Sequence, residues 1–336
     1  MTRLRIWVCC WVISGIISRA VPVGAAEPGV IEKAKAEGEL VLYTAWGLDT
    51  VQALQKAFAK KYPFIKVDVL RSGSERLLNV TIAEHKQKLF RADVFSGSHL
   101  AMINHTKAGH LQKYISAEQR AFPKEYKDSD GYWTAFYMDT RVLAYNTKMA
   151  VRDELPKSYE ELLLPKWKGK MGMDNADYIL YGTLQEMMGR ERGSAFLKKL
   201  AQQDLIIRSG HPILTQLLIG GEFPVYMDAF GSTIERFKAQ GAPIDWVAVE
   251  PVIVSLNPLG MAVNAPHPAS AKLLIDFLLS KEGQDIGRNV AKLPARADVE
   301  APYPRLTKGL KLYPVPNAVA ERYGEIVKDF RETFLK

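Results

Sequence analysis

The sequence predicts an α/β protein with two lobes, each a mixed β-sheet flanked by helices. Three observations lead to this prediction. Strand-like and helix-like segments alternate between residues 39 and 99, and the alternation starts again between about 147 and 253. The chain has 336 residues, enough for about two domains. Residues 133–170 follow the order strand, turn, short helix and strand, and they lead from the first alternating region into the second.

The first 26 residues have the pattern of a secretory signal peptide. Two arginines precede an apolar run at residues 6–17, and small residues at 23–26 suit a signal peptidase. The apolar run is too short for a permanent membrane-spanning helix, although a buried N-terminal helix is an alternative. Both cysteines, Cys9 and Cys10, lie in this leader, so the mature chain would contain no disulfide and no thiol nucleophile. We therefore expect a periplasmic protein.

The charge of the chain gives little indication of a polyanionic partner. The formal net charge is +8, and three arginines of the leader account for part of it, which leaves about +5 for the mature chain. Lysines and glutamates interleave, and no basic cluster carries interleaved aromatic residues. Nucleic-acid binding therefore has no support beyond bulk charge, whereas a mild attraction for small anions is compatible with it.

The first lobe begins with a short helix that Gly38 ends. The following elements are expected to be a strand at 39–43, a helix capped by Asp49 or Thr50, a strand at 65–69, a helix through 77–82 and a strand at 92–95. Strands and helices that alternate in this way form parallel sheets. Ligands of such sheets bind beyond the carboxyl ends of the strands, here the loops at 44–47, 71–74 and 96–99.

The second lobe repeats the pattern. The crossover that leads into it carries Ser158 and Glu161, which are spaced as a capping box and predict a short helix. The expected elements are then a strand at 171–173, helices at 178–188 and about 196–201, a strand at 205–207, a helix ended by Gly220-Gly221, a strand at 224–227 with an end loop at 228–232, a helix to Gln240 and a strand at 244–247. The chain returns through residues 255–263 and ends in a helix at about 317–334. We place the first lobe at 27–140 plus 256–336 and the second at 141–255.

Small polar residues in the strand-end loops of the first lobe are candidates for binding a ligand. Hydroxyl groups come from Thr44, Ser72, Ser74, Ser96 and Ser98, which can equally cap helices. Arg71 can bind an anionic group in a bidentate manner, or it can be an ordinary surface arginine. Trp46 can stack on a solute or can belong to the core.

Candidates in the second lobe and in the crossovers complete the predicted site. Asn175 and Tyr178 lie at a helix start, and Asp228 and Phe230 lie in the loop after a strand. Tyr137 lies on the first crossover and Asn257 on the second, where both can also serve only to stabilise the connection. Asp228 suits an amino group, so the predicted solute is anionic or zwitterionic.

Motifs distributed along the whole mature chain, in a consistent order, resemble those of one family. They are Glu37 to Thr44, Phe58 with Tyr62 to Ile65, Arg91 to Val94, Asp130 to Trp133, Ala144 to Thr147, Leu164 to Gly169, Gly241 to Pro243, and Ala265 to Pro268 with Leu278 to Gln284. This set resembles the ferric-iron and phosphonate type of type II periplasmic solute-binding proteins of ABC importers. The resemblance implies two lobes joined by two crossover segments, a solute held in the cleft between them, and delivery to an inner-membrane permease powered by a separate ATPase. It also implies a monomer without a cofactor.

The sequence departs from the ferric-binding members of that family. Those members place a histidine in the loop after the first strand and two adjacent tyrosines in the second lobe. The first loop here carries Trp46, and the second-lobe loop reads Asp228-Ala229-Phe230-Gly231 without a phenolate. We therefore expect a small polar or anionic solute, with ferric iron or an iron chelate as the alternative and no metal site. The spacing of His99, His105 and His110 also matches no familiar metal-binding pattern.

A secreted enzyme acting on a small anionic substrate is the alternative from another class. The chain contains no G-x-S-x-G, no P-loop and no G-x-G-x-x-G after the first strand. A pair of catalytic carboxylates stays open, because such pairs assemble only in three dimensions. On these grounds we expect a binding protein and not an enzyme.

Overall fold

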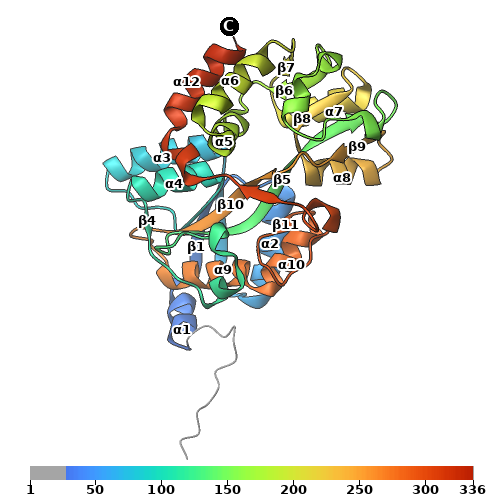
Figure 1. Ribbon diagram of the computed structural model, residues 1–336. Helices are drawn as coiled ribbons and strands as arrows, with labels where there is room; N and C mark the ends of the chain where they lie inside the picture. Colours follow the sequence, from blue (N-terminus) through green and yellow to red (C-terminus); the bar gives the residue numbers. More distant parts are fainter. Residues whose placement is uncertain (1–27, 336) are drawn as a thin grey trace, which may run out of the picture.

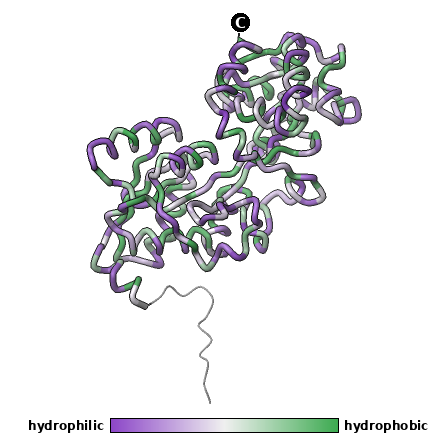
Figure 2. Tube along the Cα trace, turned by 60° about the vertical axis from the view of Figure 1, so that its left-hand side comes forward, coloured by the Kyte–Doolittle hydropathy of each residue, from purple (hydrophilic) through white to green (hydrophobic). Residues whose placement is uncertain are grey.

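The computed structural model of the protein describes residues 28–335, so the predicted signal peptide at 1–26 lies outside the described residues. Figure 1 shows two bodies, each with strands inside and helices outside, and the chain passes between them through the two long strands β5 and β10 and again through the C-terminal segment that leads to α12. Figure 2 shows the same two bodies from another side, joined by a narrower region. Within residues 28–335, no helix has the length and apolar character needed to cross a membrane.

The larger sheet, sheet A, is mixed. Its strands, in spatial order, are β2 (Lys66–Arg71), β1 (Glu39–Thr44), β3 (Val94–Ser96), β10 (Val252–Ala262) and the first half of β5 (Thr134–Asn146). Strand β1 runs parallel to β2 and β3, and β10 runs antiparallel to β3 and β5. Three short strands pair with the two long strands: β4 (Leu111–Gln112) and β12 (Leu312–Pro314) with β10, and β11 (Leu293–Pro294) with β5.

Helices cover both faces of sheet A because successive side chains of β1 point to opposite sides. Leu42 faces α2 (Leu48–Lys61) and α9 (Pro268–Leu279), where Phe58 packs edge-on against Phe277. Tyr43 faces α3 (Ser74–Lys86) and α4 (His99–Lys107). Around this core lie α1 (Pro28–Glu37), which packs on α9, and α10 (Lys281–Asn289), which packs on α2 and α9.

Sheet B is formed by the second half of β5 with β8 (Val225–Phe230), β6 (Met171–Asp174) and β7 (Ile206–Arg208), while β9 (Ile244–Val247) pairs with the other edge of β5. Leu143 and Met227 face one helical layer, formed by α5 (Tyr178–Met188), α6 (Arg190–Ala201) and α12 (Tyr323–Phe334). Ala144 and Tyr226 face the other layer, formed by α7 (His211–Gly220) and α8 (Gly231–Ala239). Both helical layers are thereby anchored by alternate residues of the same strands.

Strand β5 belongs to both sheets. Residues 134–140 pair with β10 in sheet A, and residues 141–146 pair with β8 and β9 in sheet B. The change of partner falls between Thr140 and Arg141. Side chains on either side of this point therefore belong to one strand but to two different sheets.

The C-terminal segment links the helices of the two sheets. After β12 the chain forms α11 (Asn317–Glu321), which contacts both α4 and α5, and then α12, which lies on α5 and α6. The sequence predicted one helix over 317–334, but the helix is interrupted at Arg322. The interruption lets α11 lie between α4 and α5 while α12 follows α5, and the Arg322 guanidinium binds Glu186 of α5.

Three local predictions differ from the structure. Helix α2 begins at Leu48 with Gly47 as its N-cap, because the Asp49 carboxylate accepts the Thr50 amide at 2.8 Å instead of capping the helix. The short helix predicted after Ser158 is a 3₁₀ turn, η4 (Glu160–Leu163). Residues 228–230, predicted as a loop, are the end of β8. The remaining 3₁₀ turns are η1 (Ala117–Ala121), η2 (Lys124–Tyr126), η3 (Arg152–Glu154), η5 (Pro165–Trp167) and η6 (Pro304–Leu306).

Replacing Phe330 tests how much the docking of α12 contributes to stability. Its buried ring packs against Tyr178 at 5.0 Å and Tyr181 at 5.9 Å between ring centroids. Phe330→Ala should lower the free energy of unfolding by about 3–5 kcal/mol, because it leaves a cavity under the helix. Urea denaturation measures this, with the exposed Leu335→Ala as control at about 0.5 kcal/mol or less. Equal effects of the two substitutions would contradict the packing described here.

Candidate functional site

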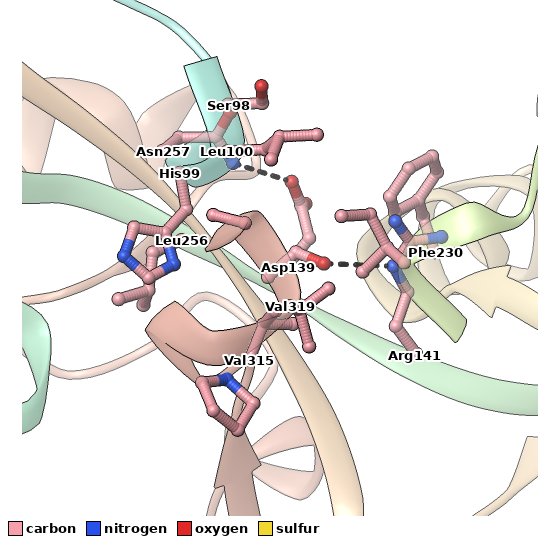
Figure 3. Close-up of a pocket in the computed structure, with 14 residues that line it drawn as sticks. Ser98, His99, Leu100, Asp139, Arg141, Phe230, Leu256, Asn257, Val315 and Val319 are labelled. Carbon is pink, nitrogen blue, oxygen red and sulfur yellow. Dashed lines mark hydrogen bonds between the residues drawn. The ribbon is translucent and has the colours of Figure 1, made fainter. Parts of the chain in front are cut away.

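A cavity of about 140 Å³ lies where the two sheets meet (Figure 3). Its wall comes from α4 and β10 of the sheet A half, from α5 and β8 of the sheet B half, from β5, and from the C-terminal segment around α11. The lining residues are Ser98, His99, Leu100, Asp139, Arg141, Ile179, Phe230, Ser255, Leu256, Asn257, Val315, Pro316, Val319 and Ala320. Most of this wall is apolar, and the few polar groups are concentrated on the two crossing strands.

The carboxylate of Asp139 is the acidic group of the cavity wall. It accepts a hydrogen bond from Asn257 Nδ2 at 3.2 Å, drawn in Figure 3, and one from Ser232 Oγ at 3.4 Å. Asn257 belongs to β10 and Ser232 to α8, so groups from both halves hold this side chain. Asp139 thus presents a fixed carboxylate to the cavity.

The guanidinium of Arg141 is the basic group of the wall. Its Nη1 donates to Asp228 Oδ2 at 2.7 Å, its Nε donates to Ser255 Oγ at 3.1 Å, and its plane lies 4.3 Å from the Phe230 ring centroid. The side chains of Arg141 and Asp228 are 10% and 1% exposed, so this ion pair is buried. Burial is the largest single effect and disfavours the charged guanidinium. The neighbouring acidic groups, Asp228 first and then Asp177, Tyr226 and Asp139, together outweigh it and raise the pKa of Arg141.

A cluster of polar side chains lies behind the ion pair. Burial, and then the charge of Asp228, raise the pKa of Asp177 well above its ordinary value. Burial, and then the charge of Arg141, lower the pKa of His211 to about 4, while His211 Nδ1 contacts the Tyr226 hydroxyl. The histidine is therefore neutral near pH 7, and Asp177 retains a proton more readily than an exposed carboxyl does.

This cluster is also the one place, within residues 28–335, where three ligand atoms gather as for a metal ion. Donor atoms of Asp174, Asp177 and His211 lie within 4.8 Å of one another. Arg141 Nη1, however, lies only 3.5 Å from His211 Nε2. A fixed positive charge at that point repels a cation, so the residues fit a proton-sharing network with Arg141 better than they fit a metal.

Three candidates from the first strand-end loops lie inside the sheet A half and not on the cavity. Thr44 Oγ1 accepts hydrogen bonds from Ser96 Oγ at 2.7 Å and from the Trp46 amide at 3.1 Å. Trp46 itself is 1% exposed and its ring lies 4.8 Å from that of Phe136. Buried polar groups form hydrogen bonds with other protein groups, and here these bonds hold the end of β1 in place. The three side chains are therefore structural and do not face the cavity.

The loop after β2 also lies away from the cavity wall. Arg71 is exposed and Ser72 is partly buried at the end of the edge strand β2. Ser74 Oγ accepts the amide of Ser98 at 3.0 Å, which ties the start of α3 to the start of α4. Ser98 in turn caps α4 by accepting the Ala101 amide at 3.3 Å, and it lines the cavity as well.

The remaining candidates also divide into residues that lie away from the cavity and residues that lie at it. Tyr137 is buried beside Trp46, Tyr178 packs against Tyr323 and Phe330, and the Asn175 amide donates to the backbone of β7. Phe230 and Asn257 line the cavity, and Asp228 lies directly behind its wall as the partner of Arg141. The structure therefore brings Ser98, Phe230 and Asn257 together and separates them from the other predicted residues.

The sequence interpretation missed the two charged residues of the wall, Asp139 and Arg141, and the contribution of the C-terminal segment. A signal for the charged pair was present. Opposite charges stand two positions apart in a strand that is otherwise almost entirely apolar, TAFYMDTRVLAYN, so both point to the same side of a buried strand. The C-terminal segment carried no comparable signal, since its wall residues are ordinary apolar residues.

The histidines that stand close together in the sequence form part of the sheet A core. His105 Nδ1 and His110 Nδ1 are 3.2 Å apart, and the His105 ring stacks on Phe95 at 4.5 Å between centroids. Burial is the main cause that lowers the pKa of His105 to about 3 and that of His110 to about 4. Both rings are therefore neutral near pH 7 and belong to the packing of α4.

Comparison of sequences places the chain among known proteins. The profile of a family described as bacterial extracellular solute-binding protein matches residues 91–310, more than half of the chain. An Fe(3+)-binding periplasmic protein of Serratia marcescens is 24% identical over 267 residues, which are 76% of this chain and 78% of that protein. A probable ABC transporter periplasmic-binding protein of Sinorhizobium fredii is 24% identical over 213 residues, 62% of this chain and 53% of that protein.

Comparison of structures gives the same fold. Iron-bound HitA from Pseudomonas aeruginosa superposes with a TM-score of 0.78 at 23% identity, covering 88% of this chain and 99% of HitA. AfuA from Actinobacillus pleuropneumoniae, solved with fructose-6-phosphate, superposes with a TM-score of 0.74 at 23% identity, covering 89% of this chain and 99% of AfuA. The predicted α/β periplasmic binding protein fold is thereby confirmed.

The buried ion pair predicts a large effect of removing one partner. Arg141→Leu should lower the free energy of unfolding by about 3–5 kcal/mol, because it leaves the Asp228 carboxylate buried without a cation. The double substitution Arg141→Leu with Asp228→Leu should recover most of that loss, since no unpaired charge remains. Urea denaturation of both variants measures the difference. Additive losses in the double variant would show that the two residues do not act as a pair.

The depressed pKa of His105 predicts a pH-dependent stability. In the unfolded chain this histidine binds a proton below its ordinary pKa of 6.5, whereas in the folded protein it does so only near 3. Its contribution to stability is therefore present above pH 6.5 and is lost as the pH falls below it, by about 1.4 kcal/mol per pH unit. His105→Phe should reduce the slope of unfolding free energy against pH between 4 and 6 by that amount. Identical slopes in the two proteins would refute the assignment.

Proposed function

This chain belongs to the bacterial extracellular solute-binding protein family, and on that premise we propose that it is the periplasmic substrate-binding component of an ABC-type importer. The family consists of solute-binding proteins and not of enzymes. A small-molecule ligand and a membrane permease are the partners that this role requires. The relative from Sinorhizobium fredii, named as a probable ABC transporter periplasmic-binding protein, supports the same assignment.

The cavity at the junction of the sheets is the observation that carries the proposal. Both crossing strands contribute to it, Asp139 and Arg141 from β5 and Ser255 and Asn257 from β10. A ligand held there contacts both halves, and a ligand can favour a closed arrangement only through contacts that differ between the open and the closed state. Capture of a solute by closure of two lobes is therefore part of the proposal. The predicted bounds, 27–140 plus 256–336 and 141–255, need one correction, because α12 (Tyr323–Phe334) packs on α5 and α6 and so belongs to the second lobe.

The solute proposed is small and polar, anionic or zwitterionic. Support comes from Arg141, Asn257 and Ser98 on the cavity wall. Ferric iron is the alternative, since the Serratia marcescens relative is named for Fe(3+) binding. No tyrosine is among the lining residues of the described cavity, and Fe(III) is a hard cation that prefers oxygen anions such as phenolate, so we favour an organic or inorganic solute over bare iron.

The location and partners follow from the same role. The protein acts in the periplasm, and residues 1–26 are proposed as the signal peptide that directs it there. We propose that it works as a monomer, delivers its solute to an inner-membrane permease and binds no nucleic acid. Neither a cofactor nor a metal is required for these steps.

Filling the cavity tests whether it is the binding site. Ala320→Leu places a larger side chain at a cavity-lining position of α11, where it competes with a bound solute for the same space. Steric crowding of this kind costs about 1–3 kcal/mol, which here should weaken solute binding. Native mass spectrometry of gently purified protein should show a small molecule on the wild type and roughly tenfold less of it on this variant.

Ala318→Leu is the matched control, on the same helix but outside the cavity lining. This variant should carry as much of the molecule as the wild type does. Equal retention by the Ala320 variant would exclude the cavity as the binding site.

A further inference from the structure

The two charged groups of the cavity wall differ in how far they are already compensated. Arg141 forms a buried ion pair with Asp228 at 2.7 Å. Asp139, by contrast, has no ion pair within 4.0 Å among residues 28–335, and its two hydrogen bonds come from neutral donors at 3.2 and 3.4 Å. Charge-assisted hydrogen bonds are typically shorter, about 2.7–2.9 Å. The carboxylate of Asp139 is therefore the incompletely compensated charge of the cavity.

The charged groups behind the cavity wall further reduce the positive charge that the wall offers to a ligand. Asp228 neutralises Arg141, Asp174 adds a carboxyl group on the same side, and His211 is neutral near pH 7. A simple anion entering the cavity would gain one interaction with an arginine that is already paired. It would also lie close to the Asp139 carboxylate without any positive charge of its own to place beside it, and the repulsion between like charges makes this unfavourable.

The volume of the cavity limits the size of the ligand, and its apolar residues favour a hydrocarbon segment in the ligand. The cavity volume of about 140 Å³ is well below the roughly 300–1,000 Å³ of pockets for drug-sized ligands. Leu100, Ile179, Leu256 and Val319 line it and suit a short hydrocarbon segment. Figure 3 shows Asp139 hydrogen-bonded to Asn257 in the middle of the lining residues, with Arg141 beside Phe230.

We propose that Asp139 binds a protonated amino group of the solute, and that the N–H donors of Arg141 that do not bind Asp228 or Ser255 bind an anionic group on the same molecule. The ligand class is then a small zwitterionic amine with a short carbon segment between its charges. This inference rests on the proposed solute-binding function and narrows it, because it excludes simple anions that lack an amino group.

Calorimetry with two matched pairs of probes tests the role of the amino group. The pairs are 3-aminopropanoate with propanoate, and phosphoethanolamine with ethyl phosphate. At least one aminated probe should bind roughly tenfold or more tightly than its amine-free partner, because only the aminated probe forms the charged contact with Asp139. Asp139→Asn, which keeps the size of the side chain, should abolish that preference.

Asp130→Asn removes an exposed carboxylate outside the cavity and serves as the control that retains the preference. Amine-free probes that bind as well as their aminated partners would overturn the inference and leave the proposed function in place. An unchanged preference in Asp139→Asn would also overturn it. If no probe binds, the compound released from wild-type protein decides, and a compound without a basic nitrogen overturns the inference. A wild type that binds no probe and releases no compound would count against the proposed function as well.

Discussion

The structure depends on one buried guanidinium at the point where a single strand passes from one sheet to the other. Arg141 is the first residue of β5 to pair within sheet B, and it donates to Asp228 of that sheet and to Ser255 on β10 of sheet A. Removing two charges from water is costly, and apolar residues of similar size would often serve stability equally well. A buried pair at a sheet junction is therefore better explained by the site it positions than by the stability it adds.

The rest of the site follows from that junction. Asp139, two residues earlier on β5, still belongs to sheet A, so the two charges of the cavity wall lie on the same strand but in different sheets. Asn257 holds Asp139 from the second crossing strand, and α11 closes the cavity with apolar side chains from the C-terminal segment. Any movement of one sheet relative to the other changes the spacing of these groups, which gives a bound solute a direct influence on the arrangement of the halves.

Much of the fold was accessible from the sequence because its strands and helices have clear periods. Helix α5 has the predicted bounds, and β1 and β9 were placed within one residue. The site was less accessible, because hydroxyl residues at strand ends have two uses. Thr44 and Ser96 bond to each other inside the core, whereas Ser98 both caps α4 and lines the cavity. Sequence position alone does not separate these uses, since the difference lies in what packs on each loop from distant parts of the chain.

The central claim is that the solute binds at the sheet junction, between the two crossing strands. A crystal structure of the protein purified with its own solute measures this most directly. We predict ligand density within hydrogen-bonding distance of Asp139, Arg141 and Asn257, with α11 covering it. Density confined to the loops at 44–47 and 71–74, or on the outer surface of either half, would contradict the claim.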